Sequence, residues 1–359
     1  MPGRTWRLPA PLDRALAPLR GRVASRRRTA FIFSGGGSLG AVQVGMLRAL
    51  VEAGVQPDII IGCSVGAING AGFAAEPSLR GVARLERIWR KLATGNPELM
   101  PGGLMPLALQ LARKGESLHD PATLETLLDE ELPAATFDEL QVPFQCVATD
   151  LATATEFWFT EGDLIHALMA SASLPAIYPA RDHGDRTLID GGVLNEVHAD
   201  RAVDWGATEL YVLHVGHLDE RPTDVQRPFD SAMRAYWTAR RFRLEENLRR
   251  VPPECVVHRL PAGTTPRLRF DDFTRGPDLA EVAYTRTAAY LRTGEMPAEE
   301  QPEPAEQPEP AEQPEPDADV PELLAHVDDP SSRGDRRSET EADEHSPLAG
   351  AEPSNGPET

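Results

Sequence analysis

Short apolar runs and longer stretches with helical spacing follow one another between Thr29 and Leu291. The short runs indicate strands, and apolar residues three or four positions apart, such as Val44, Leu47 and Leu50, indicate helices. Strands are predicted over residues 29–34, 58–63, 144–150, 156–160, 186–190, 210–215 and 255–260. Helices are predicted over residues 40–53, 64–75, 164–173, 229–250 and 279–291, and residues 76–140 are predicted to be mainly helical.

The first of these elements have the order of a strand–helix–strand unit. Residues 58–63 include an unbroken isoleucine run, which suits a strand buried on both faces of a sheet. Units of this length join parallel strands through a crossover helix. The chain is therefore predicted to adopt an α/β fold with a mainly parallel central sheet. The proline-bounded segment 174–179 is predicted to be extended.

Composition divides the chain into three regions. Residues 1–28 are rich in Pro, Arg and Ala, and residues 295–359 contain the repeat Glu-Gln-Pro-Glu-Pro-Ala. Dense proline and glutamate do not bury a core, so the acidic tail is predicted to be disordered, with no identified partner. A single domain is predicted over residues 29–294. The basic extension is expected to be solvated, which is favoured over lipid contact by an amphipathic turn at residues 12–19.

The net charge of −20 is unevenly distributed. The tail holds 20 acidic residues and 3 arginines, whereas residues 1–30 hold 8 arginines and 1 aspartate. No basic patch with interleaved aromatics occurs in the body, so no nucleic-acid partner is expected. Cys63, Cys146 and Cys255 have neither metal-ligand nor disulfide spacing, which favours a reduced, cytoplasmic compartment and no metal. Neither a secretory signal nor a membrane span is expected.

A glycine-rich turn, Gly35-Gly36-Gly37-Ser38-Leu39-Gly40, follows the first predicted strand. One interpretation is a dinucleotide-type phosphate loop, because Gly35, Gly37 and Gly40 fit the pattern G-x-G-x-x-G. That interpretation expects an acidic residue about 20 positions further on, near the end of the next strand. The next strand instead ends at Ser64. An oxyanion hole is favoured over a nucleotide site, because consecutive glycines let backbone N–H groups approach a tetrahedral intermediate.

The second glycine-rich turn, Gly62-Cys63-Ser64-Val65-Gly66, follows the isoleucine strand and matches the nucleophile elbow GxSxG. A sharp strand-to-helix turn strains the serine backbone, so its neighbours two positions away must be small. The hydroxyl then lies at a helix N-terminus, where the dipole favours developing negative charge. Ser64 is therefore the candidate nucleophile.

The candidate base is a carboxylate. Asp190 ends a predicted strand and is followed by Gly191 and Gly192. We expect this strand to present Asp190 at the carboxyl edge of the sheet, where Ser64 also lies. A histidine triad is the alternative, and its candidates downstream of the nucleophile are His198, His214 and His258.

The three motifs, in this order, resemble those of the patatin-like phospholipase family over roughly residues 30–204. Residues 170–175 also resemble the family's segment before the aspartate motif. The resemblance implies a three-layer α/β/α fold with a nucleophile elbow, and a lipid acyl hydrolase that needs no cofactor. It implies a Ser64–Asp190 dyad that works through an acyl-enzyme, and an oxyanion hole. The implied oxyanion loop comprises Gly35, Gly36, Gly37 and Ser38, and the supporting motif positions are Gly40, Gly62, Gly66, Gly191 and Gly192.

One position departs from the family pattern. Many members carry Arg or Lys where this chain has Leu39, so a local positive charge is missing. The alternative function is therefore a catalytically weak or silent protein that binds lipid or acyl groups. Residues 99–109 are rich in Met, Leu and Pro, and are interpreted as a lid or an interfacial membrane contact, or else as an ordinary helix packed on the sheet. The expected substrate is a lipid or acyl ester, with peripheral contact to the inner face of the membrane.

Overall fold

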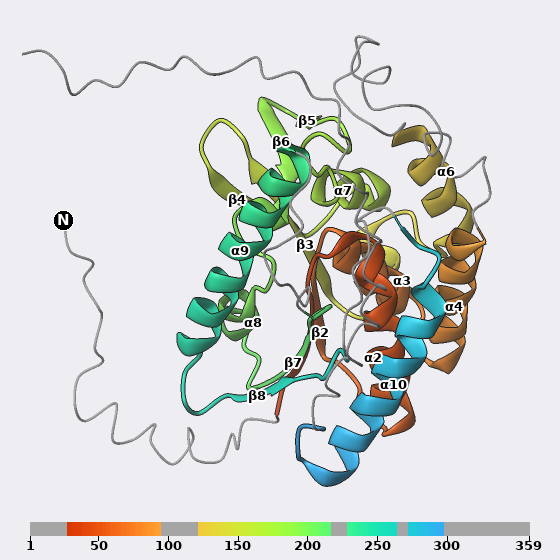
Figure 1. The fold of residues 1–359 in the computed structure, drawn as a ribbon. Helices are drawn as coiled ribbons and strands as arrows, with labels where there is room; N and C mark the ends of the chain where they lie inside the picture. Colours follow the sequence, from red (N-terminus) through yellow and green to blue (C-terminus); the bar gives the residue numbers. More distant parts are fainter. Residues whose placement is uncertain (1–26, 95–120, 217–227, 264–271, 298–359) are drawn as a thin grey trace, which may run out of the picture. The chain divides into compact units, whose positions relative to one another are not determined.

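The computed structural model describes residues 27–94, 121–216, 228–263 and 272–297 of the chain (Figure 1). Its strands are β1 (Thr29–Phe33), β2 (Ile59–Cys63), β3 (Phe144–Asp150), β4 (Thr155–Phe159), β5 (Arg181–His183), β6 (Arg186–Asp190), β7 (Glu209–Leu213) and β8 (Val256–Arg259). Its α-helices are α2 (Ala41–Glu52), α3 (Val65–Ala75), α4 (Leu79–Ala93), α6 (Pro121–Glu131), α7 (Leu164–Ser171), α8 (Ala199–Asp204), α9 (Pro228–Arg249) and α10 (Gly276–Thr293). Short 3-10 turns are η1 (Gly37–Gly40), η2 (Phe137–Glu139) and η3 (Gly191–Val193).

The strands form one eight-stranded sheet in the order β5-β6-β3-β2-β1-β7-β8, with β4 also paired to β3. The pairs β1–β2, β1–β7, β2–β3 and β7–β8 are parallel. The pairs β3–β4, β3–β6 and β5–β6 are antiparallel. The predicted mixed α/β fold with a mostly parallel central sheet is therefore confirmed.

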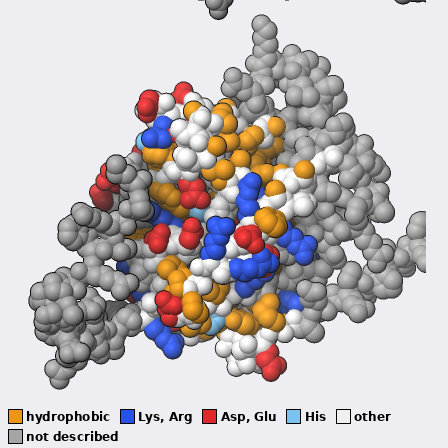
Figure 2. All heavy atoms as spheres, turned by 90° about the vertical axis from the view of Figure 1, so that its left-hand side faces the viewer, with side chains coloured by type: hydrophobic (Ala, Val, Ile, Leu, Met, Phe, Trp, Pro, Cys, Tyr) orange, Lys and Arg blue, Asp and Glu red, His pale blue; other side chains and the backbone are white. Residues whose placement is uncertain are grey.

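Alternating residues of β1 and β2 build two cores on opposite faces of the sheet. Phe31 and Phe33 belong to the larger core, which α2, α3, α4, α6, α7 and α10 cover. Ala30 and Ile32 belong to a smaller core, which α8 and α9 cover. The face of the molecule that carries α9 mixes basic, acidic and hydrophobic side chains (Figure 2). Within α9, Phe242 is exposed, whereas Leu244 is fully buried.

Local sequence sets several helix ends. The side chains of Ser78 and Asp163 accept the N–H of Gly81 and of His166, which caps the first turns of α4 and α7. Helix α10 ends at Gly294, whose φ of 72° suits glycine. Within α2, a Cβ on Gly45 would lie 1.9 Å from the carbonyl oxygen of Ala280 in α10. The helices α2 and α10 therefore pack with their backbones in close contact at this point.

Most predicted elements appear with ends shifted by one to three residues. Two short elements, β5 and α8, were not predicted, and the expectation for residues 174–179 was wrong. That segment is a turn. The N–H groups of Ile177 and Tyr178 both donate to the carbonyl of Leu174, and the backbone φ of Ala176 is 71°. Residues 99–109 and almost all of the predicted extension and tail lie outside the described residues. None of the described helices is long and apolar enough to cross a membrane.

Candidate active site

Ser64 occupies a strained turn between β2 and α3. Its φ of 56° and ψ of −128° fall in a region that residues other than glycine rarely adopt. A Cβ on Gly66 would lie 2.3 Å from the carbonyl oxygen of Ser34, and one on Gly62 would lie 2.5 Å from the Cα of Ala67. Small residues on both sides therefore let the elbow form against the strand and loop beside it.

Ser64 and Asp190 meet because two strands approach each other end to end. Along one side of β3, Val147 pairs with Cys63 of β2 and the next residue, Ala148, pairs with Asp190 of β6. Strand β4 pairs with both residues and therefore occupies the other side of β3. Because β6 runs antiparallel to β3, its carboxyl end points toward the carboxyl end of β2. The expected meeting is found, but the reason is this antiparallel approach and not a shared edge of parallel strands.

The side chains of the two residues are in direct contact. Ser64 Oγ donates to Asp190 Oδ2 at 2.5 Å, and the other carboxylate oxygen accepts the N–H of Gly192 at 2.7 Å. Asp190 is only 2% exposed. Burial raises the pKa of its carboxyl, and this effect outweighs the opposing hydrogen bond from Ser64, the charge of Arg240 and the Gly192 N–H. A raised pKa makes this carboxylate a better proton acceptor than an exposed one.

The glycine loop lies against the nucleophile. Gly36 and Gly37 line the same cavity as Ser64, whereas Ser38 is fully buried and Leu39 belongs to the larger core. A Cβ on Gly35 would lie 3.2 Å from the Cβ of Ser64. A Cβ added at any of the five supporting glycines would lie 3.0 Å or less from a neighbouring atom, namely at Gly40, Gly62, Gly66, Gly191 and Gly192.

Two buried amides hold the two ends of this loop. Gln43 Nε2 donates to the carbonyls of Ser34 (2.7 Å) and Leu213 (3.0 Å), and the Ser34 N–H also bonds to Leu213 (3.2 Å). Asn69 Nδ2 donates to the carbonyl of Gly40 (3.0 Å) and to Gln43 Oε1 (2.9 Å). The indole N–H of Trp89 donates to Asn69 Oδ1 at 3.1 Å and completes the network.

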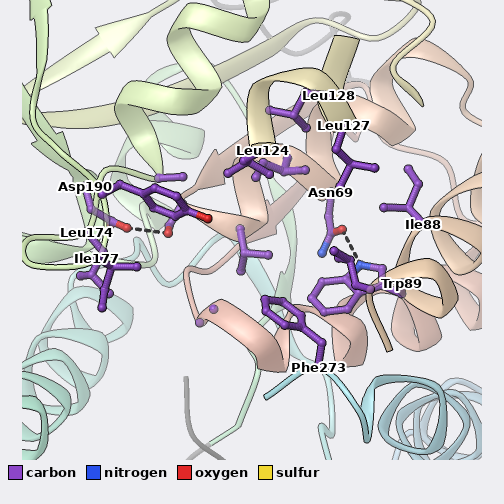
Figure 3. A pocket seen from close by; sticks show the side chains of 18 of the residues that line it. Asn69, Ile88, Trp89, Leu124, Leu127, Leu128, Leu174, Ile177, Asp190 and Phe273 are labelled. Atoms are coloured by element: carbon purple, nitrogen blue, oxygen red, sulfur yellow. Dashed lines mark hydrogen bonds between the residues drawn. The ribbon is translucent and has the colours of Figure 1, made fainter. Parts of the chain in front are cut away.

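An apolar cavity of about 150 Å³ opens beside the dyad (Figure 3). Gly36, Gly37, Ser64 and Asp190 line one part of it. Apolar side chains from α4, α6, the 174–177 turn and Phe273 line most of the rest: Leu85, Ile88, Leu92, Leu124, Leu127, Leu128, Leu174 and Ile177. Dry apolar cavities of about this volume bind small hydrocarbons.

Comparison with known proteins places these features in a family. The model of the patatin-like phospholipase family matches residues 31–203, which contain the glycine loop, the elbow and Asp190. The part of the chain that carries the candidate site is therefore patatin-like. The chain is 31% identical to patatin-like phospholipase domain-containing protein 7 of Mus musculus over 60% of its own length. It is 25% identical to lysophospholipase NTE1 of Phaeosphaeria nodorum over 63% of its length. In both alignments the chain covers 15% of the relative.

Solved structures resemble the chain more weakly. Human GIVD cytosolic phospholipase A2 matches with a TM-score of 0.42 and 12% identity, covering 79% of this chain and 64% of the other. VipD from Legionella pneumophila matches with a TM-score of 0.39 and 14% identity, covering 75% of this chain and 67% of the other.

The three histidines of the alternative triad are engaged elsewhere in the structure. His198 faces Glu156 at 3.1 Å, His214 faces Glu196 at 3.3 Å, and His258 stacks on Tyr211. Among the described residues that line the cavity there is no histidine. The fold therefore brings Asp190, and none of these histidines, to Ser64.

Sequence reasoning missed several side chains around the dyad of the patatin-like domain. Gln43 and Asn69 hold the loop, Ser171 Oγ accepts the backbone N–H of Ser64 at 2.9 Å, and Arg240 lines the cavity. For Gln43, Asn69 and Ser171 the available sign was a polar residue inside an otherwise apolar helical stretch, and it did not specify their contacts. Arg240 lies in an arginine-rich stretch, which offered no such sign.

Proposed function

We propose that this chain hydrolyses fatty acyl esters of lipids, with Ser64 as the nucleophile and Asp190 as the general base. The observation that carries the proposal is the 2.5 Å contact from Ser64 Oγ to Asp190 Oδ2 beside an apolar cavity. The family match and the lysophospholipase name of one relative support a lipid ester as the substrate. The proposed class is a serine carboxylic ester hydrolase of phospholipase A or lysophospholipase type.

The reaction proceeds in two steps. Asp190 takes the proton of Ser64 Oγ while that oxygen attacks the ester carbonyl, and backbone N–H groups of Gly35–Gly37 stabilise the resulting oxyanion. The alcohol leaves with the proton from Asp190, and the acyl group stays on Ser64. Asp190 then takes a proton from water while the resulting hydroxide attacks the acyl carbonyl. The bond from that carbon to Ser64 Oγ breaks, the fatty acid leaves, and the proton returns from Asp190 to Ser64 Oγ. The apolar cavity holds the acyl chain, and the cost of exposing that chain to water favours its burial there.

Hydrolysis of chromogenic acyl esters by the purified protein tests this proposal. Ser64→Ala and Asp190→Asn are each expected to lower kcat/KM by at least about 10³-fold, because nucleophile and base act as one unit. Asp185→Asn, which changes an exposed carboxylate near the same strand, is the matched control and should retain full activity.

Covalent labelling separates this proposal from its alternatives. A fluorophosphonate should label the wild type and Asp185→Asn but not Ser64→Ala. Folded wild type that binds lipid vesicles but neither hydrolyses esters nor reacts with the probe would establish the silent lipid-binding alternative. Activity that survives in Asp190→Asn and disappears in a histidine variant would replace the dyad with a histidine triad. Profiling the active enzyme against phospholipids, lysophospholipids and neutral esters then identifies the head group.

A further inference from the structure

Arg240 is a buried cation that lies near both residues of the candidate dyad. It lies on α9, is 4% exposed and lines the cavity. A Cβ added to Gly35 would lie 2.9 Å from Arg240 Nη2 and 3.2 Å from the Cβ of Ser64, so these two atoms are close to the same point. In the same way, a Cβ added to Gly192 would lie 3.0 Å from Asp190 Oδ1 and 3.4 Å from Arg240 Cζ. The guanidinium is therefore close to both the nucleophile and the base.

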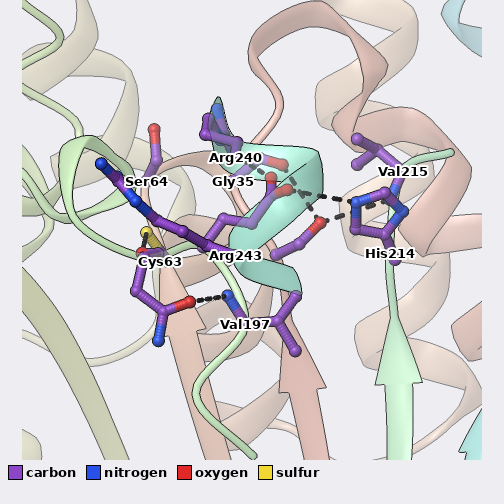
Figure 4. Close-up of polar contacts among 12 residues, drawn as sticks. Gly35, Cys63, Ser64, Val197, His214, Val215, Arg240 and Arg243 are labelled. Carbon is purple, nitrogen blue, oxygen red and sulfur yellow. Dashed lines mark hydrogen bonds and ion pairs between the residues drawn. The ribbon is translucent and has the colours of Figure 1, made fainter. Parts of the chain in front are cut away.

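Buried and half-buried groups hold this guanidinium, and Figure 4 shows Arg240 together with His214 and Ser64. It forms an ion pair with Glu196, donates to the hydroxyl of Tyr236 at 3.4 Å and lies over the ring of Trp237 at 4.5 Å. Glu196 also bonds to His214 Nε2 at 3.3 Å. Because His214 Nδ1 accepts the N–H of Gly216, its Nε2 carries the proton and donates to the carboxylate.

We propose that Arg240, oriented by Glu196, is an electrostatic positioning residue that acts through Asp190 and holds that carboxylate in its charged, proton-accepting form. This inference rests on the proposed function of the Ser64–Asp190 pair. A buried ion pair such as Arg240–Glu196 adds little net stability, because desolvation offsets its attraction. Its position beside the candidate base gives it a role in function instead. The glycine loop itself carries no charged side chain, so the cation comes from a helix far along the chain.

The electrostatics of the pocket agree with this role. The charged and titratable groups around Asp190 are Arg240, Glu196, Tyr236 and Cys63. Burial raises the pKa of Asp190, and Arg240 is the charge that opposes this effect, while the smaller influence of Glu196 adds to it. Burial also raises the pKa of the Tyr236 hydroxyl and of the Cys63 thiol, so both are neutral at physiological pH. Removing the cation would therefore make Asp190 harder to ionise.

The test is the pH profile of ester hydrolysis by Arg240→Met. The acid limb of kcat/KM should move upward by at least about one pH unit, which lowers the rate about tenfold at any pH below both limbs. Activity should return toward the wild-type value at alkaline pH, where Asp190 ionises without help. Arg240→Lys keeps the charge and should keep most of the wild-type profile. Arg201→Met removes another arginine that lies over an aromatic ring, Trp158, outside the cavity, and should leave the profile unchanged.

A second variant is needed in case Arg240→Met does not fold, because that substitution leaves the buried Glu196 carboxylate without its cation. Arg240→Met combined with Glu196→Gln removes both charges, and its acid limb should still lie above that of the wild type. An unchanged acid limb in the folded double variant would overturn the inference while leaving the proposed function intact. A loss that is equal at all pH values, or confined to phosphate-bearing substrates, would also overturn it, since it would assign Arg240 to the oxyanion or the head group. Wild type without any hydrolysis would instead refute the proposed function.

Discussion

The hydroxyl oxygen of Ser171 accepts the backbone N–H of Ser64 at 2.9 Å, although the two residues are 107 positions apart. Ser171 is the last residue of α7, and it is fully buried. The bond supports the strained backbone of the nucleophile from the side of the fold that also carries Asp190.

Ser171→Ala should therefore lower kcat while leaving KM nearly unchanged, because it loosens the nucleophile and does not touch the cavity. Leaving the N–H of Ser64 without a partner should also cost about 1–3 kcal/mol of stability. Ser173→Ala is the control. Its hydroxyl is equally buried but donates to the carbonyl of Met169. A comparable fall in kcat in Ser173→Ala would show that removing any buried hydroxyl from this segment has the same effect.

The buried amides should control the glycine loop. Asn69→Ala removes the bond to the carbonyl of Gly40 and the partner of the Trp89 indole, so kcat/KM should fall about 10–100-fold through misplaced oxyanion donors. Gln145→Ala also deletes a buried amide, but its partner is Arg201, outside the cavity. Steady-state kinetics of both variants at equal folded fraction test the expectation. Equal losses in the two variants would contradict it.

Backbone strain at Ser64 should appear as a stability difference between two inactive variants. Ser64→Ala and Ser64→Gly both delete the hydroxyl, but only glycine accepts a φ of 56° without strain. Ser64→Gly should therefore be more stable than Ser64→Ala by about 1–3 kcal/mol in denaturant titrations. Ala154→Gly relieves a φ of 52° in a different turn and provides the reference for strain relief alone. Equal stabilities of the two Ser64 variants would mean that the elbow stores no strain.

Asp190 should reduce the stability of the fold at neutral pH. Its folded-state pKa is raised by burial, so its contribution is fully present below the unfolded pKa of about 4 and is lost as the pH rises through the folded value. Asp190→Asn should therefore raise Tm at pH 7, by about 2–4 °C for each kcal/mol relieved, and this gain should vanish below about pH 4.

Asp150→Asn is the matched contrast for that experiment. Burial acts to raise the pKa of Asp150, but the bonds from Arg186 and from the N–H groups of Thr153 and Ala152 outweigh it and lower the pKa. This variant should lose stability at neutral pH, and the loss should shrink as the pH falls through the folded pKa. Thermal melts across the pH range would contradict both expectations if the two variants changed in the same direction.

The apolar cavity should set the length of the acyl chain that the site accepts. Leu127→Trp fills part of the wall formed by α6 and should lower kcat/KM for long-chain esters at least about tenfold more than for acetyl or butyryl esters. Leu79→Trp adds the same ring at a position that is 51% exposed and should leave the ratio unchanged. A uniform loss over all chain lengths would instead indicate that the wall had shifted and that the acyl chain lies elsewhere.

The sequence predicted those parts of the site that local rules determine. Ser64 follows from the elbow pattern, because strain and crowding there require glycines two positions away. Asp190 lies in contact with Ser64, but its approach along an antiparallel strand depends on pairings with β3 that no local pattern contains. Strand β5 and helix α8 span three and six residues, too few to establish a periodicity.

The remaining site residues could not be predicted from the sequence, for a different physical reason. Ser171, Asn69 and Gln43 bond to partners in other elements, and a polar residue in a helix is by itself compatible with an exposed face. Arg240 is the clearest case, because an arginine-rich helix normally turns its charges toward solvent. Only the packing of α9 against the sheet, together with the carboxylate of Glu196, made burial of this residue acceptable.

The anchoring of the glycine loop to Leu213 has a consequence for the order in which the protein is made. Both Ser34 and Gln43 bond to that carbonyl, which lies at the end of β7, about 180 residues after the loop. A chain emerging from the ribosome therefore presents its GxSxG serine well before the strand that fixes the loop has been synthesised. The loop is anchored only once β7 has been added beside β1, so the proposed activity should be absent from chains that end before Leu213.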